Sequence, residues 1–154
     1  MRTPELVLGD FQAQIAAINI GEAELLQVVN KYGLEGFRSG ITELLDYTVR
    51  LTRQGLRSLP DGEWSFTDYL DNDGVNLDQL IRISVNAIVG DGEVTFDLDQ
   101  SSRQVDGPFN CVPSGSLSAA CFAVRVLTGS DIPTNGGCFR PIHLRLPKGS
   151  IVNP

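Results

Sequence analysis

The period of the hydrophobic pattern changes near Gly62, and this change restricts the folds available to the chain. Before Gly62, apolar residues recur at spacings of three, four and seven; over residues 64–98, they alternate with polar residues. The first pattern is typical of helices with one buried face, and the second of strands with one buried face. Because the two patterns occupy separate parts of the chain, the sequence predicts an α+β fold with segregated layers.

Two helical stretches are expected before Gly62. Asp10 is placed to cap the start of the first stretch, and Gly33 suits its end. The apolar stripe of the first stretch comprises Phe11, Ile15, Ile18, Leu25, Val29 and Tyr32, and that of the second Phe37, Ile41, Leu44, Leu45 and Thr48. Two long helices joined by a short turn are expected to pack as an antiparallel hairpin.

An antiparallel β-meander is expected after the hairpin. Alternating runs within residues 64–70, 81–89 and 94–98 predict its strands, and Asp91-Gly92 predicts a tight turn between the last two. The acidic run Asp71–Gly74 does not match the calcium-binding register of an EF-hand, so a turn is expected there. A third helix is predicted over residues 117–127, with Ser114 or Ser116 as its cap and Gly129 as its stop. The expected fold is therefore a helical hairpin and a third helix packed on an antiparallel meander.

A polar loop, Ser101–Asn110, follows the last strand of the meander. It carries hydroxyls, amides, a guanidinium and a carboxylate, and Gly107-Pro108 interrupts it. Such a loop either bonds to the backbone of its own domain or lines a cleft that binds a ligand. The third helix should point its N-terminus back at this loop, where backbone N–H groups could meet an anion unless a serine caps them. Asp10 and Gln14 share one helical face, either as a cap and a solvated amide or as polar contacts to a buried site.

Charge and motif content exclude several kinds of function. The net charge of −7 and the lack of any Lys/Arg run argue against nucleic acid or an anionic membrane as partner. No apolar stretch approaches 18 residues and no signal-peptide pattern is present, which favours a cytoplasmic location. The chain has no phosphate-binding G-x-x-x-x-G-K-[ST] loop, and Gly115–Ala119 is not a G-x-S-x-G elbow.

The histidine and cysteine content predicts no metal site. The single histidine, His143, cannot supply a three-ligand zinc site, and strand alternation places it on an exposed face. The three cysteines, Cys111, Cys121 and Cys138, form no C-x-x-C pair, so reduced and mostly buried thiols are expected. A reactive thiol at Cys111, beside the polar loop, stays open as an alternative.

Several motifs occur in one order along nearly the whole chain. They are Arg2-Thr3-Pro4-Glu5, Gly9–Ala17, Lys31-Tyr32-Gly33, Ser101–Asn110, Ser118-Ala119, Asp131-Ile132-Pro133 with Asn135 and Gly137, Arg140-Pro141-Ile142, and Pro147–Ser150 before Asn153-Pro154. Together they resemble the hydantoinase B family, the B-type subunits of ATP-dependent hydantoinases. That family includes the matching half of 5-oxoprolinase and subunits of acetone and acetophenone carboxylases.

The resemblance implies a division of labour between two subunits. An A-type, ATP-binding subunit with an actin-like kinase fold uses ATP and Mg to phosphorylate a small cyclic amide or ketone. The B-type subunit then hydrolyses or carboxylates the activated species at a divalent metal site. The His and Asp ligands of that metal are implied to lie N-terminal to the matched region. The chain is thus interpreted as a single domain, 1–154, from the middle of a longer subunit, with Met1 an artificial start.

These inferences lead to a specific hypothesis for function. The chain is expected to be a segment of the B-type (beta) subunit of an ATP-dependent cyclic-amide hydrolase of the EC 3.5.2 type. The isolated segment is expected to be inactive and to bind no metal or cofactor. The candidates for substrate contact or for support of the site are Asp10, Gln14, Ser101, Ser102, Gln104, Asn110 and Arg140. The alternatives are a noncatalytic scaffold for subunit contact and the equivalent segment of a ketone carboxylase.

Overall fold

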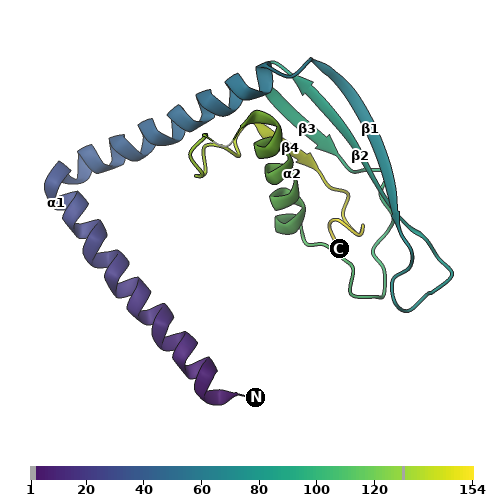
Figure 1. Ribbon diagram of the computed structural model, residues 1–154, viewed down its shortest axis with the longest axis horizontal. Helices are drawn as coiled ribbons and strands as arrows, with labels where there is room; N and C mark the ends of the chain where they lie inside the picture. The colour runs from purple at the N-terminus through teal and green to yellow at the C-terminus, as the bar shows by residue number, and fades with distance from the viewer. Residues whose placement is uncertain (1–2, 130) are drawn as a thin grey trace. The chain divides into compact units, whose positions relative to one another are not determined.

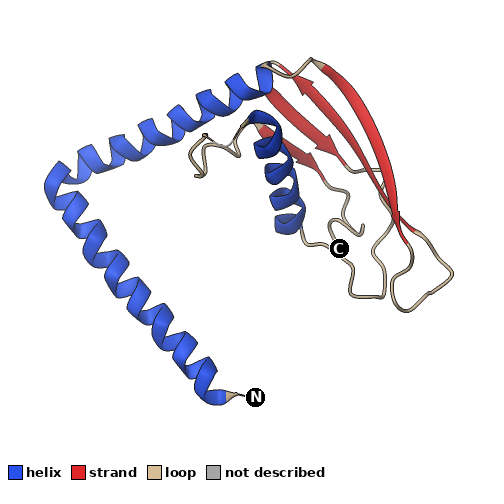
Figure 2. Cartoon of the chain, in the orientation of Figure 1, coloured by secondary structure: helices blue, strands red, loops and turns tan. Residues whose placement is uncertain are grey.

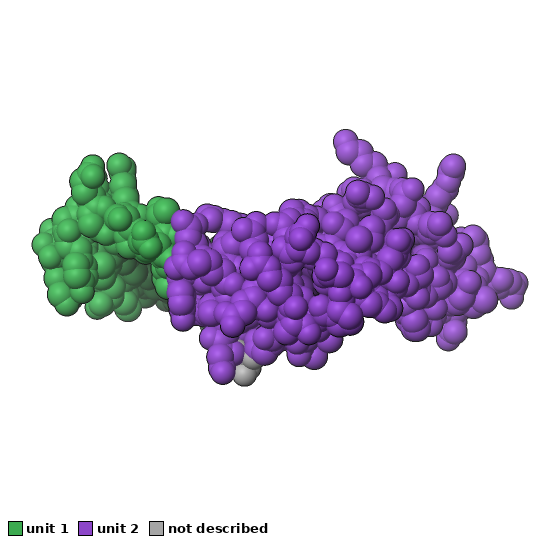
Figure 3. Space-filling model, turned by 90° about the horizontal axis from the view of Figure 1, so that it is seen from above, with its two compact units in different colours: residues 1–44 green, residues 45–154 purple. Residues whose placement is uncertain are grey.

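The computed structural model describes residues 3–129 and 131–154, so Arg2 of the first motif lies outside the described residues. Within these residues the chain forms two helices and one four-stranded sheet (Figures 1 and 2), which confirms the α+β class. The chain divides into two compact units, residues 1–44 and 45–154 (Figure 3). Neither helix combines, over its described residues, the length and apolar character that a membrane crossing requires.

Helix α1, Pro4–Arg57, contains both helical stretches. It begins at Pro4 rather than at Asp10, which corrects the predicted cap. Proline suits the first helical position because its missing N–H would have no partner there, and Glu5 favours the positive end of the helix dipole. Asp10 therefore lies inside the helix, where it is exposed.

The predicted break at Gly33 is confirmed, but it is a single residue. Gly33 has φ 73° and ψ 161°, and helical geometry resumes directly after it. A helical hairpin usually has a loop of about two to five residues. Within the described part of the first unit, most of the apolar stripe of the first stretch, including Phe11, Ile15 and Ile18, is exposed.

The sheet belongs to the second unit and has the order β1-β2-β3-β4. Strands β1 (Gly62–Leu70), β2 (Ile81–Gly90) and β3 (Glu93–Asp97) form the predicted antiparallel meander. Strand β4 (Ile142–Arg145) pairs with β3 in parallel, so the sheet is mixed rather than purely antiparallel. Helix α2 lies between β3 and β4 in the chain and provides the crossover that parallel strands require.

The turn between β2 and β3 has the predicted chemistry. Asp91 and Gly92 have φ values of 53° and 73°, the left-handed conformation that a two-residue hairpin of this type needs at both positions. The register then sets the two faces of the sheet. Trp64 and Phe96 both pair with Ala87 on one face, whereas Ser65 and Asp97 both pair with Asn86 on the other. The first face is mainly apolar and the second polar.

Helix α2, Pro113–Thr128, covers part of the apolar face (Figure 1). Its N-cap is Val112, without a side-chain hydrogen bond, which corrects the prediction of a serine cap; Pro113 occupies the first helical turn. Its C-cap is the predicted Gly129. The main core comprises Leu56, Val94, Ala120, Cys121, Val124 and Ile142, and a second cluster comprises Ile81, Ile151 and Val152.

Candidate functional site

Two serine side chains attach the polar loop to β2. The Ser101 hydroxyl accepts a hydrogen bond from the Ser84 backbone N–H and lies within bonding distance of the Ser84 carbonyl oxygen, both at 3.1 Å. The Ser102 hydroxyl accepts from the Arg82 N–H at 2.9 Å, and the Ser102 N–H donates to the Arg82 carbonyl at 2.8 Å. Strand β3 ends at Asp97, which pairs with Asn86, so it does not reach Ser84 or Arg82. The two serine hydroxyls take its place as hydrogen-bond partners of β2 there.

Asn110 closes the loop on itself. Its Oδ1 accepts from the Val105 N–H at 2.9 Å, and its Nδ2 donates to the carbonyls of Val105 and Gly107 at 2.7 and 3.2 Å. Gly107 is required by a close approach, since a Cβ atom there would lie 1.6 Å from the Asp73 carbonyl oxygen. Ser101, Ser102 and Asn110 therefore hold the shape of the loop.

The C-terminal motif lies against the same loop. The Gln104 N–H donates to the Gly149 carbonyl at 2.9 Å, and the Ile151 N–H donates to the Ser102 carbonyl at 3.0 Å. Ile151 is buried in the second apolar cluster with Ile81. Two motifs that are far apart in the sequence are thus in contact. The backbone hydrogen bonds of the C-terminal motif help to hold the shape of the loop.

A polar pocket of about 330 Å³ opens beside the loop. Residues of the segments 73–81 and 102–106 line it. Among the described residues, the side chains of Gln79, Arg103, Gln104 and Asp106 have no hydrogen-bond or ion-pair partner. The sequence predicted Gln104 as a candidate but did not single out Gln79, whose segment carries only turn signals. The lining of the pocket therefore includes two free amides, a guanidinium and a carboxylate.

Asp73 supports one wall of this pocket. Its carboxylate accepts hydrogen bonds from the backbone N–H groups of Asn76 and Val75 and from the Asn76 side chain. The Asn76 N–H is the largest of the contacts that hold the pKa of Asp73 below its ordinary value. A buried carboxylate with this set of donors stays ionised and orders the predicted turn at residues 71–74.

The N-terminus of α2 does not contribute to the pocket, because no α2 residue lines it. The Ser116 hydroxyl donates instead to the Val152 carbonyl at 3.0 Å. Cys111, just before the helix, is partly exposed, while Cys121 and Cys138 are buried, and all three are free thiols. Over residues 3–129 and 131–154, no group of three or more His, Cys, Asp or Glu side chains could hold a metal ion.

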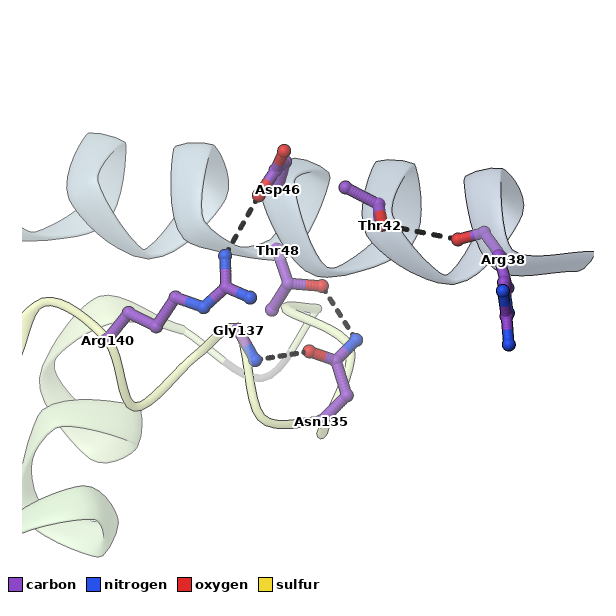
Figure 4. A network of polar contacts seen from close by, with 7 residues as sticks. All are labelled: Arg38, Thr42, Asp46, Thr48, Asn135, Gly137 and Arg140. Carbon is purple, nitrogen blue, oxygen red and sulfur yellow. Dashed lines mark hydrogen bonds and ion pairs between the residues drawn. The ribbon is translucent and has the colours of Figure 1, made fainter. Parts of the chain in front are cut away.

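Arg140 belongs to a different network (Figure 4). Its Nη1 lies 2.9 Å from Asp46 Oδ1, and nearby the Asn135 amide donates to the Thr48 hydroxyl at 2.9 Å. The Asn135 side chain also accepts from the Gly137 N–H at 2.8 Å. These contacts tie the segment before β4 to the last part of α1, and Arg140 does not line the polar pocket.

Asp10 and Gln14 lie in the first unit. They are one helical turn apart and exposed on α1. The other candidate residues all lie in the second unit. Of the predicted set, Ser102 and Gln104 line the polar pocket, and only Gln104 does so with a free side chain.

Comparison with known proteins identifies the family. The family model described as Hydantoinase B/oxoprolinase matches residues 1–154. The B-type subunit of a putative D-/L-hydantoinase from Pseudomonas sp. (strain NS671) is 37% identical, with 100% of this chain and 28% of that protein covered. The chain therefore belongs to the hydantoinase B/oxoprolinase family, and it spans only about a quarter of the length of such relatives.

Solved structures agree with this assignment. The crystal structure of ATP-dependent caprolactamase from Pseudomonas jessenii matches with a TM-score of 0.88 and 30% identity, covering 97% of this chain and 26% of that chain. A nucleotide-free acetone carboxylase structure matches with a TM-score of 0.69 over 84% of this chain and 19% of that chain. At 19% identity, the second likeness concerns the fold alone.

Proposed function

We propose that this chain is a segment of the B-type (beta) subunit of an ATP-dependent amidohydrolase that opens cyclic amides, such as hydantoin or 5-oxoproline. In this proposal an A-type subunit of kinase-like fold activates the substrate with ATP and Mg, and the B-type subunit completes the hydrolysis. The family match over residues 1–154 and the likeness to the caprolactamase support the proposal. The divalent metal of the reaction would be held by residues outside this chain.

We further propose that the polar pocket contributes contacts to the substrate. The observation that carries this step is the set of free side chains of Gln79, Arg103 and Gln104 at one pocket. A cyclic amide presents an N–H donor beside a C=O acceptor, and a glutamine carboxamide offers the complementary acceptor and donor. The guanidinium of Arg103 could bind a carboxylate or phosphorylated oxygen through two parallel hydrogen bonds. Gln104 and Arg103 would thus orient the ring.

A scaffold role is the second candidate, and a specific observation favours it. The side chains of Ser101, Ser102 and Asn110 are all bonded to backbone groups of their own unit. In a scaffold, the motifs would preserve the shape of the loop without contacting substrate. The two candidates make different predictions for Gln104, whose side chain supports no part of the fold.

The experiment for the overall proposal uses the full-length protein that carries this segment, together with its A-type partner. Hydantoin, 5-oxoproline, caprolactam and acetone are supplied separately with ATP, and ring-opened acid, carboxylated product and ADP are measured. We expect ring opening of at least one cyclic amide that depends on ATP and on both proteins. Carboxylation of acetone without ring opening of any cyclic amide would contradict the proposal and favour a ketone carboxylase.

A further inference from the structure

The charged side chains that line the polar pocket are Asp73, Arg103 and Asp106. The Asp73 carboxylate already accepts hydrogen bonds from groups of Val75 and Asn76. Within the part of the chain that the structure describes, the Arg103 guanidinium and the Asp106 carboxylate have no hydrogen-bond or ion-pair partner, and they do not pair with each other. The lining of the pocket therefore includes one unpaired positive charge and one unpaired negative charge.

The backbone that carries these two charges is held by hydrogen bonds. Arg103 forms an antiparallel bridge with Ser150 of the C-terminal motif. Asn110 bonds to backbone groups of the residues on both sides of Asp106. Binding groups on a fixed backbone lose less conformational freedom when a ligand arrives. The pocket is thus suited to a ligand that carries two opposite charges.

Hydrolysis of a lactam produces such a molecule. The C–N bond of the ring breaks, the oxygen of water becomes part of a carboxyl group, and the nitrogen becomes an amine. At neutral pH the carboxyl group is ionised and the amine is protonated, because their ordinary pKa values are about 4 and about 10. A neutral ring therefore becomes a zwitterionic amino acid. Opening a hydantoin differs, since it leaves a neutral ureido group and no ammonium group.

We propose that the polar pocket binds the zwitterionic amino acid that lactam hydrolysis releases, and that this product inhibits the enzyme. The Arg103 guanidinium binds the carboxylate of the product, and the Asp106 carboxylate binds its ammonium group. The inference rests on the proposed function, in which the same pocket contacts the cyclic amide. A neutral lactam forms neither ion pair, so the product binds there more tightly than the lactam does.

Three matched probes test the requirement for both charges. 6-Aminohexanoate, the ring-opened form of caprolactam, carries both charges, whereas hexanoate carries only the carboxylate and hexylamine only the ammonium group. Titration calorimetry with the full-length protein, without ATP or the A-type partner, gives each Kd. 6-Aminohexanoate should bind at least ~10-fold more tightly than either other probe, because it makes one more charge-assisted hydrogen bond. Equal affinity for the three probes, or no binding of 6-aminohexanoate at millimolar concentration, would overturn the proposal.

Substitutions assign each charge to a residue. Arg103→Gln and Asp106→Asn should each weaken binding of 6-aminohexanoate by at least ~10-fold. Both should leave the free energy of unfolding unchanged, because neither side chain bonds to the rest of the described chain. Arg50→Gln and Asp99→Asn are the matched controls, since both residues are exposed and lie outside the pocket lining. Losses as large in the controls as in the pocket variants would show an effect of net charge alone and overturn the assignment.

L-Alanine distinguishes the product of a lactam from amino acids in general. The charged groups of Arg103 and Asp106 do not pair with each other, so a ligand with separated charges bridges them better than one with adjacent charges. L-Alanine should therefore bind at least ~10-fold more weakly than 6-aminohexanoate. Equal affinity would indicate a general amino-acid site and overturn the assignment to the product.

Turnover tests the inhibition and separates it from the proposed function. In the ring-opening assay, 6-aminohexanoate should slow the reaction of the full-length enzyme at concentrations at which hexylamine has no effect. An unchanged rate would overturn product inhibition. Binding of the zwitterion by a protein that opens no cyclic amide would contradict the proposed function and keep the zwitterion site. Ring opening by a protein that does not bind the zwitterion would do the reverse.

Discussion

The Ser101 hydroxyl meets both backbone polar groups of Ser84, each at 3.1 Å. One side chain therefore supplies the two hydrogen bonds that a neighbouring strand would otherwise make to this residue of β2. Ser84 is buried, so its N–H and C=O need a protein partner at this position. The relationship explains why a hydroxyl directly follows the short strand β3.

Replacing Ser101 with alanine should lower the free energy of unfolding by ~1–3 kcal/mol, the cost of orphaning a buried polar group. Urea unfolding of the purified chain measures this change. Ser118→Ala is the control, because Ser118 bonds only to the Ser114 carbonyl on an exposed part of α2 and its loss should cost less than ~0.5 kcal/mol. Equal effects of the two substitutions would contradict the assigned role of Ser101.

The turn at Gly92 offers a second stability test. Gly92 has φ 73°, and a Cβ atom there would lie 3.0 Å from the Arg53 carbonyl oxygen. Gly92→Ala should therefore destabilise the chain by ~1–2 kcal/mol, the cost of a left-handed conformation for alanine. Gly90→Ala, which meets nothing within 4 Å, should be neutral or slightly stabilising in the same melting experiment. A Gly92→Ala chain as stable as the parent would argue against the turn geometry.

Glu93 connects three elements of the second unit. Its carboxylate lies 2.7 Å from His143 Nε2 on β4 and 2.5 Å from Arg53 Nη2 on α1. The hydrogen bond with His143, followed by that with Arg53, holds the pKa of Glu93 below its ordinary value of 4.5. His143 is exposed on its strand, as predicted, and has a carboxylate partner that the local sequence pattern does not reveal.

The stabilisation from Glu93 should depend on pH. Because its pKa is lower in the folded state, the contribution is fully present above the unfolded value of 4.5 and is lost as pH falls through the folded value. Glu93→Gln should cost at most ~1 kcal/mol near pH 6, since the side chain is 37% exposed, and the difference from the parent should vanish at low pH. Urea unfolding at several pH values measures it. A difference in unfolding free energy that stays constant across the acid range would contradict the assigned role of Glu93. Glu22→Gln is the control, because Glu22 is exposed.

Local signals predicted most of the fold. The Asp91-Gly92 turn, the alternating strands and Gly129 at the end of α2 each depend on neighbouring residues and are confirmed. The two predicted helix caps were wrong because prolines at Pro4 and Pro113 set the helix starts instead. The parallel pairing of β4 with β3 depends on the path of α2 rather than on any local pattern.

The candidate site was predictable only in part. The density of polar groups in Ser101–Asn110 indicated an ordered loop, but the partners of Ser101 and Ser102 lie on β2, 17 and 20 residues away. Sequence alone could not separate side chains that hold the loop from those that remain free. Gln79 comes to the pocket from a different turn, and no residue pattern links it with Gln104.

The most direct test of the proposed substrate contact compares Gln104→Ala with Gln54→Ala in the full-length enzyme with its A-type partner. Gln54 is an exposed helical glutamine outside the pocket lining and serves as the matched control. We predict that Gln104→Ala lowers kcat/KM for ring opening by at least ~10-fold, because a substrate amide loses its hydrogen-bond partner. The free energy of unfolding and the association with the A-type subunit should stay unchanged. Gln54→Ala should leave all three quantities unchanged. Full activity of Gln104→Ala would contradict the substrate contact and leave the scaffold role for this segment.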